Sequence, residues 1–177
     1  MIDVHGAGCQ RSDPKDGDPN DFPSWGHGPQ GDMQRVFNYV RPVRDTVSPQ
    51  ISYLLVDTGQ SACYDRDGAE IACPKEGEAF AGQDAEYDGT PMSYTDNGDG
   101  TVTDNVTGLM WQQTPADYGM SWQEAADYCE SLQLAGYDDW RMPTTKELFS
   151  ISDFSQGWPY LDTTYFDLAG SNVSKDE

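Results

Sequence analysis

The sequence predicts an α+β fold in which short antiparallel strands precede two short helices. Three observations indicate this class. Turn-forming Asn-Gly and Asp-Gly pairs separate β-prone runs between residues 94 and 112. Capping-box signatures then begin helical patterns at Ser121 and at Thr144. Strands that are followed by helices, instead of alternating with them, are typical of α+β domains.

The first part of the chain is predicted to contain irregular segments and isolated strands. Residues 1–33 are rich in Gly, Pro and Asp and are expected to form an extended loop. Gln34–Arg41 is rich in β-branched and aromatic residues, which predicts a strand. That strand is expected to end at Pro42, which has no N–H to donate to a sheet. Val43–Pro49 is interpreted as a connector and Ile51–Val56 as a second short strand.

Residues 94–112 predict a three-stranded meander. The first turn is expected at Asn97-Gly98 and Asp99-Gly100, and the second at Thr107-Gly108, because these residue types adopt positive φ angles easily. The apolar run Leu109-Met110-Trp111 is expected to form the last strand.

Two helices are predicted after the meander. Ser121 with Glu124 marks the start of the first helix, and Gly136 is expected to end it. Thr144 with Glu147 marks the start of the second helix. The residues expected to face inward are Trp122, Ala125, Ala126, Cys129 and Leu132 in the first helix, and Leu148 and Ile151 in the second. The tail after Gly157 has no clear element but contains the aromatic anchors Trp158, Tyr160, Tyr165 and Phe166.

The charge of the chain excludes several classes of partner. The formal net charge is −21, and residues 46–177 carry 24 acidic but five basic residues. Such a field repels nucleic acids and anionic lipids, so we expect no nucleic-acid partner. No segment has the ~18 consecutive apolar residues of a membrane span, so we expect no membrane insertion.

The cysteines predict an oxidising compartment. The four cysteines, Cys9, Cys63, Cys73 and Cys129, allow three complete pairings. Cys63 and Cys73 are symmetric about Gly68, so a reverse turn there brings their Cβ atoms within bonding reach. This favours a local disulfide; the alternative is two free buried thiols. The sequence contains no Cys-X-X-Cys pair, so we do not expect a zinc site. The disulfide favours an exported protein. The N-terminus has no signal-peptide pattern, so the signal is expected to lie outside this chain or to have been removed.

Residues 94–150 carry several motifs in a fixed order. They include Thr95-Asp-Asn-Gly-Asp-Gly-Thr-Val-Thr-Asp104, Gly108-Leu-Met-Trp111, Ser121-Trp-Gln-Glu-Ala-Ala-Asp-Tyr-Cys129 and Asp139-Trp-Arg-Met-Pro-Thr-Thr145. This order resembles the first half of the Lcl C-terminal domain family, which occurs at the end of bacterial collagen-like surface adhesins. The resemblance implies a C-type-lectin-like fold and a non-enzymatic recognition or adhesion module, extracellular or on the cell surface.

A second resemblance lies near the start of the chain. The family's domain ends in a strand similar to Tyr-Val-Arg-Cys-Val-Arg, which is similar to Asn38-Tyr-Val-Arg-Pro-Val-Arg44 after the run Gly28–Asp32. Relative to the family, the domain is therefore expected to be incomplete or permuted. The implied parts are 1–45, the end of a lectin-like domain; 46–93, a connector with a strand and the disulfide hairpin; and 94–177, the first half of a lectin-like domain.

Two arrangements are consistent with this order. The chain is either a window across tandem domains or a permuted domain whose two pieces complete each other. The strand predicted at Arg35–Arg41 has two apolar faces and must pair, either with the 94–112 meander of its own chain or with a neighbouring chain. In the second case, residues 1–45 mediate self-association by strand addition, and the protein is a structural subunit of a surface assembly or filament.

The resemblance also implies roles for single residues. Cys129 matches a helix cysteine that bonds to a cysteine of the last strand. That position is Pro42 here, which leaves Cys9 as the candidate partner. The family's structural segment corresponds here to Asp139, Trp140, Arg141 and Pro143. In that segment, a buried ring and an ion pair are expected to brace the entry to the second helix.

One turn superficially resembles a calcium-binding loop. An EF-hand aligned on Gly100 needs an acid at Thr95 and a Glu at Val106, and neither is present. Hairpin formation explains the same glycines and short polar residues. Calcium is therefore the alternative to a purely structural hairpin, and no other cofactor is expected. The candidate calcium ligands are Asp96, Asn97, Asp99 and Asp104.

No catalytic motif is present in the sequence, so we expect no enzyme. His5 and His27 lie in Gly-rich segments with no nucleophile motif nearby. Polysaccharide or a surface protein is the expected partner. Sulfated polysaccharides, with which the family's adhesins are associated, require basic patches, and three basic residues follow residue 100. The candidates for stacking on a sugar ring are Trp25, Trp158 and Tyr160, with Tyr87 and Tyr118. The alternative for each of these rings is core packing.

Overall fold

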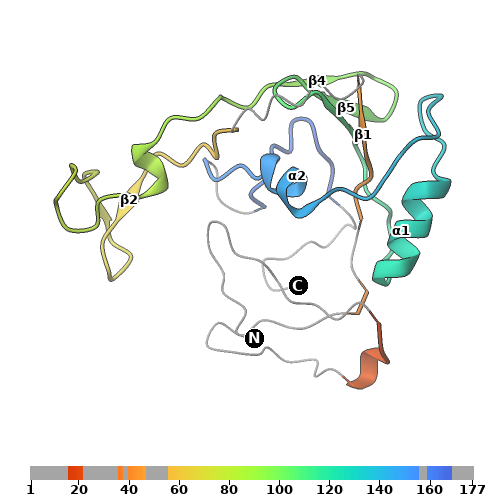
Figure 1. The fold of residues 1–177 in the computed structure, drawn as a ribbon, viewed down its shortest axis with the longest axis horizontal. Coiled ribbons are helices and arrows are strands. Elements are labelled where there is room, and N and C mark those ends of the chain that lie inside the picture. The colour runs from red at the N-terminus through yellow and green to blue at the C-terminus, as the bar shows by residue number, and fades with distance from the viewer. Residues whose placement is uncertain (1–15, 22–35, 38–39, 47–55, 156–158, 169–177) are drawn as a thin grey trace.

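The fold belongs to the predicted α+β class. The structure is a computed structural model, and antiparallel strands form a four-stranded and a two-stranded sheet, with two short α-helices after them (Figure 1). The described residues also include two 3-10 helices, η1 (Pro19–Asp21) and η2 (Asp84–Glu86). The structure describes residues 16–21, 36–37, 40–46, 56–155 and 159–168.

The larger sheet has the strand order β1-β6-β5-β4. β4 (Tyr94–Asp96), β5 (Thr101–Asp104) and β6 (Leu109–Gln112) form an antiparallel meander, which confirms the prediction. Gly98 and Gly100 have φ angles of 73° and 85° at the first turn. Glycine adopts these angles without a Cβ clash, so the turn forms where the sequence places it.

The remaining strand of this sheet, β1 (Val43–Asp45), comes from the N-terminal part of the chain and pairs with β6. The strand predicted at Gln34–Arg41 is therefore misplaced: its described residues, 36, 37, 40 and 41, are not in a strand. The connector predicted from Val43 is wrong for the same reason. Pro42 has no N–H to donate, so it interrupts the ladder on its N-terminal side. Its carbonyl still accepts a hydrogen bond from the Gln112 N–H at 3.1 Å. The ladder thus continues on the C-terminal side of the proline.

Arg41 anchors this N-terminal segment to the rest of the sheet. Its buried guanidinium donates hydrogen bonds to the carbonyls of Gln112 and Asp167, both at 2.6 Å, and to that of Gln113. It also lies 5.1 Å from the centroid of the Phe166 ring. Burial lowers the pKa of Arg41 to about 10, so the group stays charged at neutral pH. Of the two pairings considered from the sequence, the segment around residue 43 adopts the one within its own chain.

Two hydrophobic clusters form the core. The first packs the sheet against the segment that follows α2, and it contains Val43, Tyr94, Val102, Leu109, Trp111, Ile151 and Phe166. The second joins the N-terminal segment to the loop and helix after β6, and it contains Val40, Ala116, Met120, Ala125 and Cys129. The predicted anchor Phe166 is fully buried in the first cluster, against which Tyr165 packs.

Both predicted helices form and begin with the predicted capping boxes. α1 (Trp122–Ser131) is capped by Ser121, and α2 (Thr145–Ser150) by Thr144. α1 ends before Gly136, because the chain turns back and Leu134 pairs with Tyr137.

Two predictions about inward-facing residues are wrong. Trp122 is exposed, since the buried stripe of α1 is narrow and contains Ala125 and Cys129. Leu148 is exposed too, because α2 lies on the surface and contributes no buried residue of its own. Ile151, the residue directly after α2, is buried as predicted.

The smaller sheet is a hairpin of β2 (Cys63–Tyr64) and β3 (Glu70–Ile71), set apart from the larger sheet (Figure 1). Cys63 and Cys73 form the predicted disulfide, with their Cα atoms 5.1 Å apart. Of the strand predicted at Ile51–Val56, residues 51–55 lie outside the described residues. Val56 forms a single bridge with Thr90.

Candidate functional site

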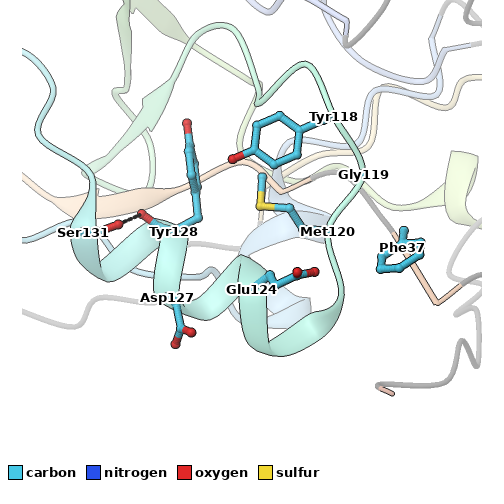
Figure 2. Close-up of a pocket in the computed structure, with 8 residues that line it drawn as sticks. All are labelled: Phe37, Tyr118, Gly119, Met120, Glu124, Asp127, Tyr128 and Ser131. Atoms are coloured by element: carbon cyan, nitrogen blue, oxygen red, sulfur yellow. Dashed lines mark hydrogen bonds between the residues drawn. The ribbon is translucent and has the colours of Figure 1, made fainter. Parts of the chain in front are cut away.

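An open pocket of about 450 Å³ lies beside helix α1 (Figure 2). It lies among three parts of the chain. Phe37 comes from the N-terminal segment, and Tyr118, Gly119 and Met120 come from the loop before α1. The helix itself contributes Glu124, Asp127, Tyr128 and Ser131.

The loop before α1 is fixed on both sides. Met120 is buried in the second core cluster, and Ser121 directly after it caps the helix. A Cβ on Gly119 would lie 3.2 Å from the Cβ of Phe37. Glycine at this position therefore lets the N-terminal segment approach the loop and form one side of the pocket.

Two carboxylates line the pocket one helical turn apart, Glu124 and Asp127. Glu124 Oε2 accepts hydrogen bonds from the N–H of Ser121 at 2.8 Å and from its hydroxyl at 2.7 Å, and these bonds lower the pKa of Glu124. Asp127 Oδ1 accepts a hydrogen bond from the Gln123 side chain at 2.8 Å. Within the described part of the chain, neither carboxylate has a basic partner. None of the hydrogen bonds among the described residues reaches Glu124 Oε1 or Asp127 Oδ2.

The aromatic side chains of the pocket differ in exposure. Tyr118 is 56% exposed and Phe37 is 46% exposed, whereas Tyr128 is half-buried. The Tyr128 hydroxyl accepts a hydrogen bond from Gln112 Nε2 at 3.1 Å, which fixes the ring against the end of β6. Two rings are therefore free to pack on a ligand, and a third is held in place.

The segment predicted to brace the second helix is structural, although its ion pairs differ from the expectation. Trp140 is 2% exposed, and its Nε1 donates to the Leu134 carbonyl at 3.4 Å. Asp139 pairs with Arg44 of β1 at 2.7 Å, not with its neighbour Arg141. The Arg44 guanidinium also lies 3.8 Å from the centroid of the Tyr137 ring.

Arg141 braces the first turn of the second helix. It pairs with Glu147 of α2 at 2.7 Å and with Asp45 of β1 at 3.7 Å. Pro143 directly precedes Thr144, the cap of α2. The two neighbours of Trp140 in the sequence, Asp139 and Arg141, thus form ion pairs with β1 and α2.

The calcium candidates are used within their own turns. Asp96 accepts from the Gly98 N–H, Asp99 from the Thr101 N–H and hydroxyl, and Asp104 from the N–H groups of Val106 and Thr107. Asn97 donates to Thr101 and Thr103. The described residues contain no group of three or more His, Cys, Asp or Glu side chains that could hold a metal ion.

The other predicted candidates are not gathered at one place. Cys9, Trp25, Trp158, His5 and His27 lie outside the described residues. Tyr160 does not line the pocket; its ring packs 5.2 Å from that of Phe154. Cys129 is a free, buried thiol, and burial raises its pKa to about 11.

Of the residues that line the pocket, the sequence indicates one, Tyr118, as a candidate for ligand contact. Tyr118 was among the stacking candidates, but Phe37 was assigned to a strand and Glu124 only to a helix cap. The spacing of Glu124 and Asp127, directly after an exposed aromatic loop, is the signal that points to the pocket.

The family model of the Lcl C-terminal domain matches residues 100–174. This part of the chain is therefore similar to an Lcl C-terminal domain. No curated protein and no solved structure matches the chain. The match includes β5, β6, both helices and the α1 side of the pocket, while β1, β4, Phe37 and the disulfide hairpin lie outside it.

The match is consistent with a C-type-lectin-like fold and suggests a surface-associated domain. The family and the Cys63–Cys73 disulfide together suggest an extracellular domain. Among the described helices, none has the length and apolar character that a membrane span requires.

Proposed function

We propose that this protein is a non-enzymatic extracellular recognition module that binds carbohydrate in the pocket beside α1. The observation that carries the proposal is the combination of exposed rings and carboxylates in one open pocket. Ligand sites typically combine apolar or aromatic walls with a few polar groups that fix orientation. A sugar ring packs its C–H face on Tyr118 and Phe37, while its hydroxyls donate to Glu124 and Asp127.

Charge narrows the class of carbohydrate. The pocket lining contains two acidic and no basic side chains, and the chain has a net charge of −21. A sulfated polysaccharide would be repelled from such a site. The supported ligands are therefore neutral or cationic saccharides, unlike those associated with the family's adhesins.

The chemistry of the lining supports binding and not catalysis. It holds no His or Cys, and the hydroxyl of Ser131 donates to the Tyr128 carbonyl at 3.2 Å. A nucleophile needs a base within hydrogen-bonding distance, and Ser131 has a backbone acceptor in that place.

Titration calorimetry with neutral oligosaccharides tests the proposal on wild-type protein and on Tyr118→Ala. We expect the variant to lose up to about tenfold in affinity, because a stacked ring contributes about 0.5–1.5 kcal/mol. Its melting temperature should not change, since the side chain is exposed. Tyr87→Ala is the matched control, because Tyr87 is 69% exposed and does not line the pocket. Wild-type protein that binds no saccharide, or equal binding by Tyr118→Ala, would reject the proposal.

The second function considered from the sequence, strand donation to a neighbouring chain, has less support. Residues 43–45 already pair with β6 of the same chain, so this strand is not left over for a partner. Light scattering of the purified protein distinguishes the two, because strand donation produces rings or filaments and a recognition module stays discrete.

A further inference from the structure

We propose that three aromatic side chains at the end of α2 and after it form a second saccharide-binding surface, which takes an uncharged, β-linked glycan chain. They are Phe149 of α2, Phe154 after the helix and Tyr160 in the segment that follows, and we call them the aromatic row. None of the three lines the pocket beside α1, so the proposal goes beyond the pocket and does not depend on it.

The three rings adjoin one another at the surface. The ring centroids of Phe149 and Phe154 lie 6.2 Å apart, and those of Phe154 and Tyr160 lie 5.2 Å apart. Phe149 is 39% exposed and Tyr160 is 41% exposed, while Phe154 is half-buried. Neighbouring ring planes are inclined at 42° and 39°, so no flat surface contacts the faces of all three rings. A single glycan chain, which twists about its glycosidic bonds, is able to follow such a row.

The backbone beneath the aromatic row is held by hydrogen bonds. The Phe154 N–H donates to the Thr58 carbonyl at 2.7 Å, and the Asp153 N–H donates to the Tyr160 carbonyl at 2.9 Å. Tyr160 has a φ angle of 56°, which a bulky residue rarely adopts. A non-glycine residue keeps such a conformation only where its surroundings enforce it, and residues of this kind cluster at ligand sites. The row is thus preorganised, so little free energy is needed to order it on binding.

The size of the aromatic row fits a narrow ligand better than a protein partner. An aromatic side chain buries about 150–250 Å² when it is covered, so the exposed parts of the three rings amount to roughly 200 Å². A standard protein interface buries about 800 Å² on each partner. The row therefore offers about a quarter of the area that a stable dimer needs, which suits a narrow chain of sugar rings.

Charge narrows the class of ligand. The chain has a net charge of −21, so a second copy of the chain and anionic glycans are both repelled. The rings of the aromatic row carry no charge, and such rings pack on the apolar C–H faces of a sugar. In a β-linked glucan the hydroxyls lie at the edges of each sugar, and both of its faces are C–H surfaces. An uncharged β-linked glycan therefore matches the row.

Calorimetry with cellohexaose, an uncharged β-1,4-linked glucan, tests the proposal on the purified chain. Tyr160→Gly removes one ring, and glycine adopts a φ angle of 56° without a Cβ clash, so the backbone beneath the row stays in place. Phe149→Ala removes another ring and suits a helix. We expect each variant to bind cellohexaose about three- to tenfold more weakly than wild type. Cellobiose, which is too short to contact the whole row, should bind wild type more weakly than cellohexaose does.

Phe80→Gly is the matched control. Phe80 is 49% exposed and has a φ angle of 69°, but it lies outside the aromatic row. Its replacement therefore removes an exposed ring at a positive φ angle and should leave the affinity for cellohexaose unchanged. Wild-type protein that binds no cellohexaose, or an equal loss in Phe80→Gly, would overturn the proposal.

The pocket variant Tyr118→Ala separates this proposal from the pocket. Weaker binding in Tyr160→Gly and Phe149→Ala, with unchanged binding in Tyr118→Ala, supports the aromatic row and overturns the pocket as the site for this glycan. Weaker binding in Tyr118→Ala alone overturns the row, and weaker binding in all three variants supports both surfaces. Light scattering tests the other occupant: a wild-type dimer that dissociates in Tyr160→Gly would assign the row to a second copy and overturn its assignment to a saccharide.

Discussion

Two regions of this molecule are stabilised by different means. The sheet–helix region, residues 94–155 with 159–168, fully buries large apolar side chains such as Trp111 and Phe166. The hairpin region, residues 56–91, buries one hydrophobic residue, Cys63, and that residue is part of the disulfide. One region is therefore held by a core, and the other has none.

Polar side chains replace a core in the hairpin region. The Asp57 carboxylate accepts hydrogen bonds from the N–H groups of Gly59 and Gly89, both at 2.7 Å, which lower the pKa of Asp57. The Gln83 amide accepts from the N–H of Tyr64 at 2.8 Å and donates to its carbonyl at 2.9 Å. A segment that buries so little apolar surface needs such links and a covalent bond, and the disulfide requires an oxidising environment.

The largest effect is expected in the sheet–helix region at Trp140. Truncation of this buried ring in Trp140→Ala leaves a cavity, so we expect the free energy of unfolding to fall by about 3–5 kcal/mol. Denaturant titration measures the loss. Trp122→Ala is the matched control, because the same ring is exposed there and truncation should cost much less. A loss of saccharide binding without a loss of stability would make Trp140 a ligand contact instead.

A smaller and local effect is expected in the hairpin region. Replacement of both cysteines in Cys63→Ser with Cys73→Ser opens a short loop, which is worth about 3 kcal/mol in the chain-entropy model. Because this region shares little core with the sheet, we expect faster amide hydrogen exchange in residues 56–91 and unchanged protection in β5 and β6. Equal loss of protection in both regions would show that they unfold as one unit.

The elements that were predicted correctly have local causes. The meander follows from glycine turns, the helix starts from capping boxes, and the disulfide from the symmetry of Cys63 and Cys73 around Gly68. In each case the residues that determine the structure lie within about ten positions of one another, so the sequence displays the whole interaction.

The elements that were missed depend on distant partners. β1 is placed by its pairing with β6, and Asp139 by Arg44, a residue 95 positions away. The pocket has the same origin, since Phe37 and the loop before α1 line it together although they are about 80 positions apart in the sequence. Local propensity gives no information about such contacts, which is why Tyr118 was identified as a candidate and Phe37 was not.

The smallest expected effect on stability comes from an ion pair in the sheet–helix region. In the hairpin region, by comparison, carboxylates accept hydrogen bonds from backbone N–H groups. The hydrogen bonds from Arg141 lower the pKa of Glu147 to about 2, from an ordinary value of 4.5. Because the folded-state pKa is lowered, the stabilisation is fully present above pH 4.5 and is lost as the pH falls toward about 2. Arg141 is 38% exposed, so solvent screening limits this contribution to about 1 kcal/mol or less.

Glu147→Gln tests this ion pair without removing the cap, since Gln also serves in a capping box. Urea titrations of wild type and variant across the acid range give the difference in unfolding free energy at each pH. We expect wild type to be more stable by up to about 1 kcal/mol near neutral pH, and the difference to vanish as the pH approaches the folded-state pKa of Glu147. A difference that stays constant with pH would mean that Glu147 stabilises α2 through its cap and packing and not through its charge. In that case the contrast between the two regions would rest on the core alone.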